Sequence, residues 1–144
     1  MATRWNSLVP IKVNVMIWRV ERDRLPTRLN LRDKGIDLDS LLCPICGLVG
    51  ESTEHLFAAC TQLVEIWSKI ARWWSESTPL DFTLAGCLNW ADSVVMINDN
   101  KKRFGAVVFI SIWVIWNFRS KVFFEKEKHR KDELLDDIRS FSYF

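Results

Sequence analysis

The sequence has few residues that interrupt regular structure, with five Gly and four Pro among 144 residues. This scarcity excludes a collagen-like, fibrous or low-complexity chain. Hydrophobic residues make up 49% and charged residues 26%, a balance typical of a folded, mostly helical domain rather than a disordered tail. The net charge is only +2, which argues against a protein that coats nucleic acid through bulk electrostatic attraction.

Long apolar runs are also missing. The longest uncharged segment, residues 104–118, has fifteen residues, fewer than the roughly 20 that cross a bilayer. Gly105, Ser111 and Asn117 lower its hydropathy further, so we interpret it as part of a buried core helix. The first residues lack the features of a secretory signal or a transit peptide. We therefore expect no membrane partner and a location in the nucleus or cytoplasm.

Charged and aromatic residues are unevenly distributed along the chain. The segments 1–42, 43–100 and 101–144 carry net charges of +3, −5 and +4, so two basic ends flank an acidic middle. Eight Trp and nine Phe accompany a single Tyr. Because so many rings need a core, a ligand or a partner to cover them, the surplus suggests a Trp-rich surface that meets another protein.

The apolar spacing of the first part predicts two helices joined by a turn. Residues 8–24 form the first, with Pro10 in its first turn, and a shorter second helix is capped by Thr27 and ended by Gly35. The apolar residues of the first helix, which we expect to lie side by side on a buried face, are Ile11, Val13, Val15, Ile17, Trp18 and Val20.

Further helices are predicted downstream. Ser52 or Thr53 caps a long helix that runs to about Trp74. Residues 81–98 are ambiguous and are best interpreted as a helix with a polar stop at Asn98-Asp99-Asn100.

A long apolar helix spans about residues 101–128, and a short terminal helix follows. We divide the chain into a domain over residues 5–76 and a helical extension over residues 80–144.

Two groups of basic residues are candidates for contacting phosphates. They are Arg19, Arg22, Arg24, Arg28, Arg32 and Lys34 in the first helical pair, and Lys101, Lys102 and Arg103 further along. Glu21 and Asp23 interleave with the first arginines, so much of this charge is expected to be paired or solvated. Both two packed helices with solvated arginines and a nucleic-acid-contacting surface fit this pattern.

One segment contains four potential metal ligands close together. It combines Cys43-Pro44-Ile45-Cys46-Gly47 with His55 and Cys60, in the spacing Cys-x2-Cys-x8-His-x4-Cys. Two thiolates two residues apart bind one ion from a tight turn, and Gly47 allows the backbone to fold back. His55 and Cys60 supply two further corners of a tetrahedron. Four such ligands with no open position predict a structural Zn²⁺ site, without catalysis by the metal.

The helix that carries His55 and Cys60 must be distorted. Residues five apart on an ideal α-helix differ by about 140° around the axis, so these two side chains cannot face one ion. We therefore predict a 3₁₀ turn, a late helix start or a local bulge between them.

Other interpretations of the cysteines remain open. Cys43 and Cys46 also have the spacing of a redox pair, although no thioredoxin-like strand pattern precedes them, and the four residues could be unrelated core residues. Disulfides are not expected in a reducing compartment. Cys87 is predicted to be a buried free thiol, and His129 in the charged helix needs no special role.

Several short motifs occur together in the first half of the chain. They are Trp5, Pro10-x-Lys12-Val13, Trp18-Arg19, Arg24-Leu25-Pro26-Thr27, Leu29-Asn30-Leu31, Gly35-Ile36, Cys43-Pro44-x-Cys46-Gly47, Glu51-x-x-Glu54-His55-Leu56-Phe57-x-x-Cys60 and Ile66-Trp67. In order and approximate spacing they resemble the reverse transcriptase zinc-binding domain at the C-terminal end of plant non-LTR (LINE-type) retrotransposon polyproteins. Trp113-x-x-Trp116-x-x-Arg119 resembles a signature that often follows in the same polyproteins.

The resemblance implies a nucleic-acid-associated module of an RNA-directed DNA polymerase, with Cys43, Cys46, His55 and Cys60 as zinc ligands. Polymerase chemistry itself needs convergent carboxylates that hold two metal ions, and no aromatic-x-Asp-Asp motif occurs here. Asp136-Asp137 lie in a charged helix and are interpreted as solvated. We therefore expect a severed or domesticated fragment of such an element.

Three functions fit these patterns. The first is a zinc-stabilised helical module that binds RNA or DNA through the basic residues, with exposed rings such as Trp5 stacking on bases. The second is a protein-interaction scaffold with a purely structural zinc, whose Trp-rich surface binds a reverse transcriptase core or another protein. The third is a retroelement remnant without a selected function.

Overall fold

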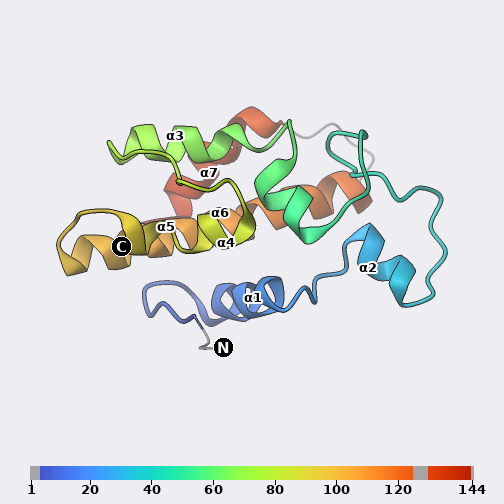
Figure 1. Cartoon of the computed structure of the whole chain (residues 1–144), viewed down its shortest axis with the longest axis horizontal. Helices are drawn as coiled ribbons and strands as arrows, with labels where there is room; N and C mark the ends of the chain where they lie inside the picture. Colours follow the sequence, from blue (N-terminus) through green and yellow to red (C-terminus); the bar gives the residue numbers. More distant parts are fainter. Residues whose placement is uncertain (1–3, 125–129, 144) are drawn as a thin grey trace.

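The computed structural model describes residues 4–124 and 130–143 and is built of helices (Figure 1). The chain is 59% helical, and its described part has no strand, only an isolated antiparallel bridge between Leu42 and Gly50. The mostly α fold predicted from the sequence is therefore confirmed. Its elements are α1 (Ile11–Glu21), α2 (Arg28–Asp33), the π-turn η1 (His55–Ala59), α3 (Glu65–Trp73), α4 (Leu84–Leu88), α5 (Trp90–Ser93), α6 (Asn98–Phe124), the 3₁₀ turn η2 (Lys131–Glu133) and α7 (Leu134–Phe141).

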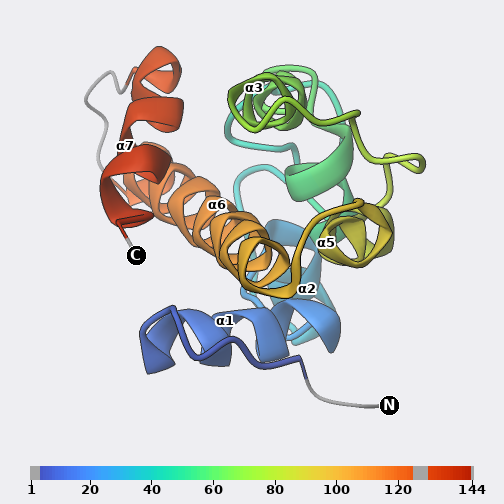
Figure 2. The same cartoon turned by 90° about the vertical axis from the view of Figure 1, so that its left-hand side faces the viewer.

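Helix α6 is the centre of the fold. It contacts α1, α4, α5 and α7, and α3 in turn contacts α7. Figure 2 shows α1 on one side of α6, with α3 and α7 on the other. Apolar side chains from both predicted segments, 5–76 and 80–144, enter one hydrophobic core, in which the Trp74 ring contacts Phe104 edge-on at 5.1 Å between centroids.

Helix α6 has 27 residues and, among the described helices, is the one long and apolar enough to cross a membrane by length and composition. Most of its side chains between Phe104 and Ile115 are buried inside the protein. The helix therefore acts as the core helix that the sequence predicted. It begins at Asn98, a few residues before the predicted start near residue 101. The predicted end near residue 128 and His129 fall within residues 125–129, which lie outside the described part of the chain.

Helix α1 buries only half of its expected apolar face. Val13, Ile17 and Val20 are fully buried, and α1 packs on α6. The apolar residues left outside are Ile11, Val15 and Trp18, which are 70, 40 and 41% exposed. The prediction that both sets lie side by side was wrong, because at 100° per residue the two triplets point in nearly opposite directions.

The inner face of α1 also includes a polar residue. Asn14 is buried because its side chain exchanges two hydrogen bonds with the backbone of Asn6. The Asn6 N–H donates to Asn14 Oδ1, and Asn14 Nδ2 donates to the Asn6 carbonyl, both at 2.9 Å. These bonds fix the segment before α1 against the helix.

The predicted limits of α2 are confirmed. The Thr27 side chain accepts a hydrogen bond from the Asn30 N–H at the start. At the end, Gly35 has φ of +82°, and the N–H groups of Gly35 and Ile36 donate to the carbonyls of Arg32 and Leu31. This is the Schellman arrangement, which favours glycine at the left-handed position.

The long helix expected from about residue 52 to Trp74 is instead two pieces. Ser52 does cap the first, since its Oγ accepts from the His55 N–H at 3.0 Å. The backbone becomes extended at Cys60, with φ −65° and ψ 120°, and α3 begins only at Glu65. The apolar stripe continues across this break, which is why periodicity alone did not reveal it.

The region 81–98 also differs from the prediction. It holds two short helices, α4, whose cap Thr83 accepts from the Gly86 N–H, and α5. Asn98-Asp99-Asn100 form the first turn of α6 and do not stop a helix. Asn and Asp favour helix starts as well as turns, so their presence alone did not decide between the two.

Candidate metal centre

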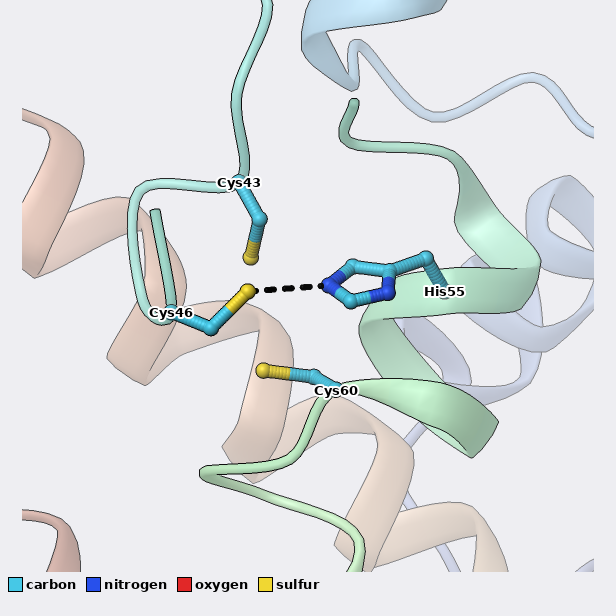
Figure 3. A group of neighbouring side chains, drawn as sticks. All are labelled: Cys43, Cys46, His55 and Cys60. Carbon is cyan, nitrogen blue, oxygen red and sulfur yellow. Dashed lines mark hydrogen bonds between the residues drawn. The ribbon is translucent and has the colours of Figure 1, made fainter. Parts of the chain in front are cut away.

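The first two ligands of the candidate metal centre lie on a tight turn between α2 and the π-turn. The Cys43 N–H donates to the Val49 carbonyl at 2.7 Å, and the Gly47 N–H donates to the Cys43 carbonyl at 2.8 Å. Gly47 has φ of +67°, a left-handed conformation that a side chain would strain. The turn directs the sulfurs of Cys43 and Cys46 toward the same point (Figure 3).

The π-turn η1 brings in the other two ligands. The Cys60 N–H donates to the His55 carbonyl at 2.7 Å, an i to i+5 bond that widens the helical turn. His55 and Cys60 consequently project to one side, facing the two cysteines of the loop (Figure 3). The local bulge predicted between them is confirmed, and it is a π-turn.

The four ligand atoms fit a tetrahedral Zn²⁺ ion. All of them lie within 4.8 Å of one another, and Cys46 Sγ is 3.3 Å from His55 Nε2. Zinc bonds of about 2.3 Å to sulfur and 2.0–2.1 Å to nitrogen imply ligand separations of roughly 3.5–3.8 Å. Cys43 and Cys60 are buried, and Cys46 and His55 are half-buried, so the set is closed in the manner of a structural site.

Electrostatics also favour a cation at this point. The Cys60 thiol hydrogen-bonds Cys43, which lowers the pKa of Cys43 to about 5. The same hydrogen bond, together with burial, raises the pKa of Cys60 above its ordinary value. Three clustered sulfurs do not all ionise unless a positive charge balances them, which Zn²⁺ supplies.

A buried ion pair supports the loop that carries the cysteines. Glu51 and Arg119 have side-chain exposures of 0 and 2% and form a bidentate pair in which Arg119 Nε donates to Glu51 Oε2 at 2.7 Å. Glu51 Oε1 also accepts from the Arg28 N–H at 2.9 Å. In the sequence both residues stood out only as members of motifs, and nothing indicated that they meet across a separation of 68 residues.

The first basic group lies on and after α1. Arg19, Arg22 and Arg24 are exposed, and no ion pair between described residues involves them. Arg22 stacks on the Trp18 ring, with its guanidinium carbon 4.3 Å from the ring centroid.

The basic residues of α2 differ in their contacts. Arg28 is half-buried, stacks over Phe123 and donates to the Ser40 carbonyl, so part of its side chain serves the fold. Arg32 is exposed and pairs with Asp33, and Lys34 is exposed.

The second basic group, Lys101, Lys102 and Arg103, occupies the first turns of α6. Lys102 and Arg119 are 17 positions apart on this helix, or about 25 Å along its axis. Asn6, just before α1, donates to the Lys102 carbonyl, whereas Arg119 approaches Pro26, just after α1. The two basic groups therefore lie near opposite ends of the α1–α6 pair.

Cys87 takes no part in the metal centre. It is fully buried, as predicted, and burial together with the nearby Glu54 and Asp81 carboxylates raises its pKa to about 12. The thiol is therefore neutral at physiological pH.

Comparison with known proteins agrees with this geometry. No curated protein and no solved structure matches the chain significantly. A family model described as zinc-binding in reverse transcriptase matches residues 1–67, which include all four candidate ligands. The matched segment ends within α3, so α4 to α7 lie outside it. Residues 1–67 of this chain thus match the zinc-binding domain of reverse transcriptases, the family that the motifs of the sequence resemble.

Proposed function

We propose that this chain is a zinc-stabilised module that binds nucleic acid through the exposed basic surface of α1 and α2, without polymerase chemistry of its own. The zinc centre holds the loop 43–51 against the π-turn, and Glu51 links that loop to the start of α2 and to α6. The metal thus has a structural role, and the binding residues lie beside it rather than on it.

The observation that carries the proposal is the use of the acidic residues around α1. Glu21 faces Arg4 at 3.5 Å. Asp23 Oδ1 accepts from Thr53 Oγ1 at 2.6 Å and from Asn30 Nδ2 at 2.9 Å. Glu21 thus pairs with Arg4, and one oxygen of Asp23 accepts from Thr53 and Asn30. Among the described residues neither carboxylate forms an ion pair with Arg19, Arg22 or Arg24, which are exposed to solvent.

The side chains around these arginines suit single strands. Trp18 is 41% exposed and lies under the Arg22 guanidinium. Flat, cationic and aromatic groups at one surface offer both a phosphate contact and a face on which an unpaired base stacks. Binding of single-stranded RNA or DNA is therefore expected to exceed binding of duplexes.

Salt-dependent titration tests the proposal. The variant Arg19→Gln/Arg22→Gln/Arg24→Gln should bind single-stranded RNA more weakly, and its slope of log affinity against log salt should be shallower by about 2, because roughly 0.7 counterions are released per single-strand phosphate contact. The variant Lys69→Gln/Arg72→Gln/Lys131→Gln removes the same charge from other surfaces and should retain the wild-type slope. Equal slopes for both variants would refute the assignment to α1.

A second function is favoured by the outer face of α1. Ile11, Val15 and Trp18 recur at positions i, i+4 and i+7 and are exposed, which is the pattern of a helix that docks into a partner's groove. A scaffold of this kind binds a protein with little dependence on salt. Salt-insensitive capture of a reverse transcriptase core, lost in Ile11→Ala/Val15→Ala, would favour the scaffold over nucleic-acid binding.

A further inference from the structure

A pocket of about 300 Å³ lies where the segment before α1 crosses α5 and the first turns of α6. Figure 2 shows this end of α6 next to α5. The polar and aromatic residues that line it are Arg4, Trp5, Asn6, Asp92, Lys101, Lys102 and Phe109. The pocket is near the lower end of the range of about 300–1,000 Å³ typical of small-ligand sites. It suits a single nucleobase with its phosphate better than a folded partner.

The walls of the pocket are fixed by hydrogen bonds. Asn6 Nδ2 donates to the Lys102 carbonyl at 2.9 Å, and Asn6 is itself held by Asn14. Arg4 donates to the Leu88 carbonyl at 3.3 Å. The segment that carries Trp5 is thereby attached to α1, to α6 and to the end of α4.

Two of the cationic side chains at the pocket are not paired with a carboxylate of a described residue. Arg4 lies between two carboxylates, at 3.5 Å from Glu21 and 3.8 Å from Asp92, so its charge is largely balanced. Lys101 and Lys102 form no ion pair with any described residue. The pocket therefore has a net positive side formed by these two ammonium groups.

Trp5 supplies the aromatic surface. Its side chain is 61% exposed even though it follows a well-bonded segment and lines the pocket. Exposing a large apolar ring is unfavourable unless something covers it. A ring next to two free ammonium groups is the combination by which proteins hold an unstacked base and its phosphate.

We propose that this pocket binds one unpaired nucleotide, whose base stacks on Trp5 and whose phosphate contacts Lys101 and Lys102. The inference rests on the proposed function and adds to it a second contact point, near the opposite end of the α1–α6 pair from Arg24. A strand that reaches both points must be single-stranded at the pocket, because a paired base is not free to stack there.

The indole N–H signals of the tryptophans, assigned with Trp5→Phe and Trp18→Phe, separate this inference from the proposed function. On addition of a short oligouridine to the full chain, shifts of both the Trp5 and the Trp18 signals support the pocket. A shift of Trp18 alone overturns the pocket and leaves binding at α1 intact. If neither signal moves, both proposals fail.

Two further ligands test the chemistry of the site. Pyrophosphate and oligoglutamate carry negative charge without a base, and they should shift Trp5 much less than oligouridine does. An equal or larger shift with either one would replace base stacking with general anion or acidic-peptide binding and would overturn the inference.

Affinity measurements complete the test. Trp5→Ala should weaken oligouridine binding roughly 5- to 150-fold, the range expected for one lost base stack, whereas Trp5→Phe should retain most of it. Lys101→Gln/Lys102→Gln should weaken binding and reduce its salt dependence. The matched controls Tyr143→Ala, an exposed ring elsewhere, and Lys69→Gln/Arg72→Gln should bind as the wild type does. Unchanged affinity in Trp5→Ala would overturn the pocket.

Discussion

The carboxylate of Glu51 and the guanidinium of Arg119 form a bidentate ion pair that is closed to solvent. Glu51 lies at the end of the loop that carries Cys43 and Cys46, and Arg119 lies on α6, outside the segment that matches the zinc-binding family. Arg119 also stacks against the rings of Trp116 and Phe123. The pair thus joins the metal-binding half of the protein to its central helix.

Breaking this pair from one side should be costly. Glu51→Gln leaves the Arg119 charge buried without a counterion, and we expect the free energy of unfolding to fall by about 3–5 kcal/mol. Gln retains an oxygen that accepts from the Arg28 N–H, so the loss reports mainly on the charge. Urea denaturation of the zinc-loaded protein measures it.

The double variant Glu51→Gln/Arg119→Met provides the control. It removes both charges and retains apolar bulk near Trp116 and Phe123, so it should be less destabilised than either single variant. If the double variant instead lost as much unfolding free energy as the two single variants together, direct coupling between these residues would be contradicted.

Removal of zinc should expose the three ligand cysteines to alkylation. In the zinc-loaded protein all three thiolates are bound. Chelation releases the loop 43–51 from the π-turn, which ends the burial and the Cys43 hydrogen bond that raise the pKa of Cys60, so Cys43, Cys46 and Cys60 should all react with iodoacetamide at pH 8. Cys87 should still resist, because its raised pKa of about 12 leaves it protonated there and its side chain is buried. Mass spectrometry should find its modification only after unfolding. Alkylation of Cys87 in the native protein would contradict its placement.

Zinc should also raise the thermal stability of the whole chain. Binding to a site that exists only in the folded state contributes on the order of 10 kcal/mol in small zinc modules. Because ligand thiols must lose protons, the stabilisation should diminish as pH falls. Calorimetry at several pH values, with Cys60→Ser as the variant that loses a ligand, measures both effects. Equal melting temperatures with and without metal would remove the structural role of the site.

The metal centre was predictable because it is local. Its four ligands lie within eighteen residues, and the spacing of His55 and Cys60 alone required a distorted helix. The sequence did not specify that the helix would also end at Cys60, since the apolar stripe resumes in α3. Caps at Thr27 and Ser52 and the left-handed Gly35 were predictable for the same reason, as each depends on neighbours within three or four residues.

Features that depend on distant contacts were not predictable. Which face of α1 is buried depends on α6, and the outer triplet of Ile11, Val15 and Trp18 is as apolar as the inner one. The Glu51–Arg119 pair spans 68 residues and follows no period. The pocket at Trp5 depends on three segments that meet only in the folded protein.

Two glycines should respond in opposite ways to substitution by alanine. Gly105 lies inside α6, and a Cβ there would approach Asn6 Nδ2 at 3.4 Å and Ala91 Cβ at 3.6 Å, which is contact without overlap. Gly105→Ala should therefore stabilise the protein by about 0.5–1 kcal/mol through helix propensity. Gly47→Ala should destabilise it despite open space, because φ there is +67°. Urea denaturation measures the change in the free energy of unfolding for each variant. Changes of the same sign in both would contradict the roles assigned to the two glycines.

The indole of Trp67 connects α3 to the metal centre, and its removal should affect both. Trp67 is fully buried, and its Nε1–H donates at 2.8 Å to the Phe57 carbonyl inside the π-turn. Trp67→Phe leaves that carbonyl without this donor and should cost at least about 1–3 kcal/mol of unfolding free energy. Because the same turn positions His55 and Cys60, we also expect weaker zinc binding in competition with a chelator. Trp73→Phe, on the same helix but only half-buried, should change neither quantity appreciably. A Trp67→Phe variant that loses stability yet retains wild-type zinc affinity would show that the π-turn is held by its metal ligands rather than by α3.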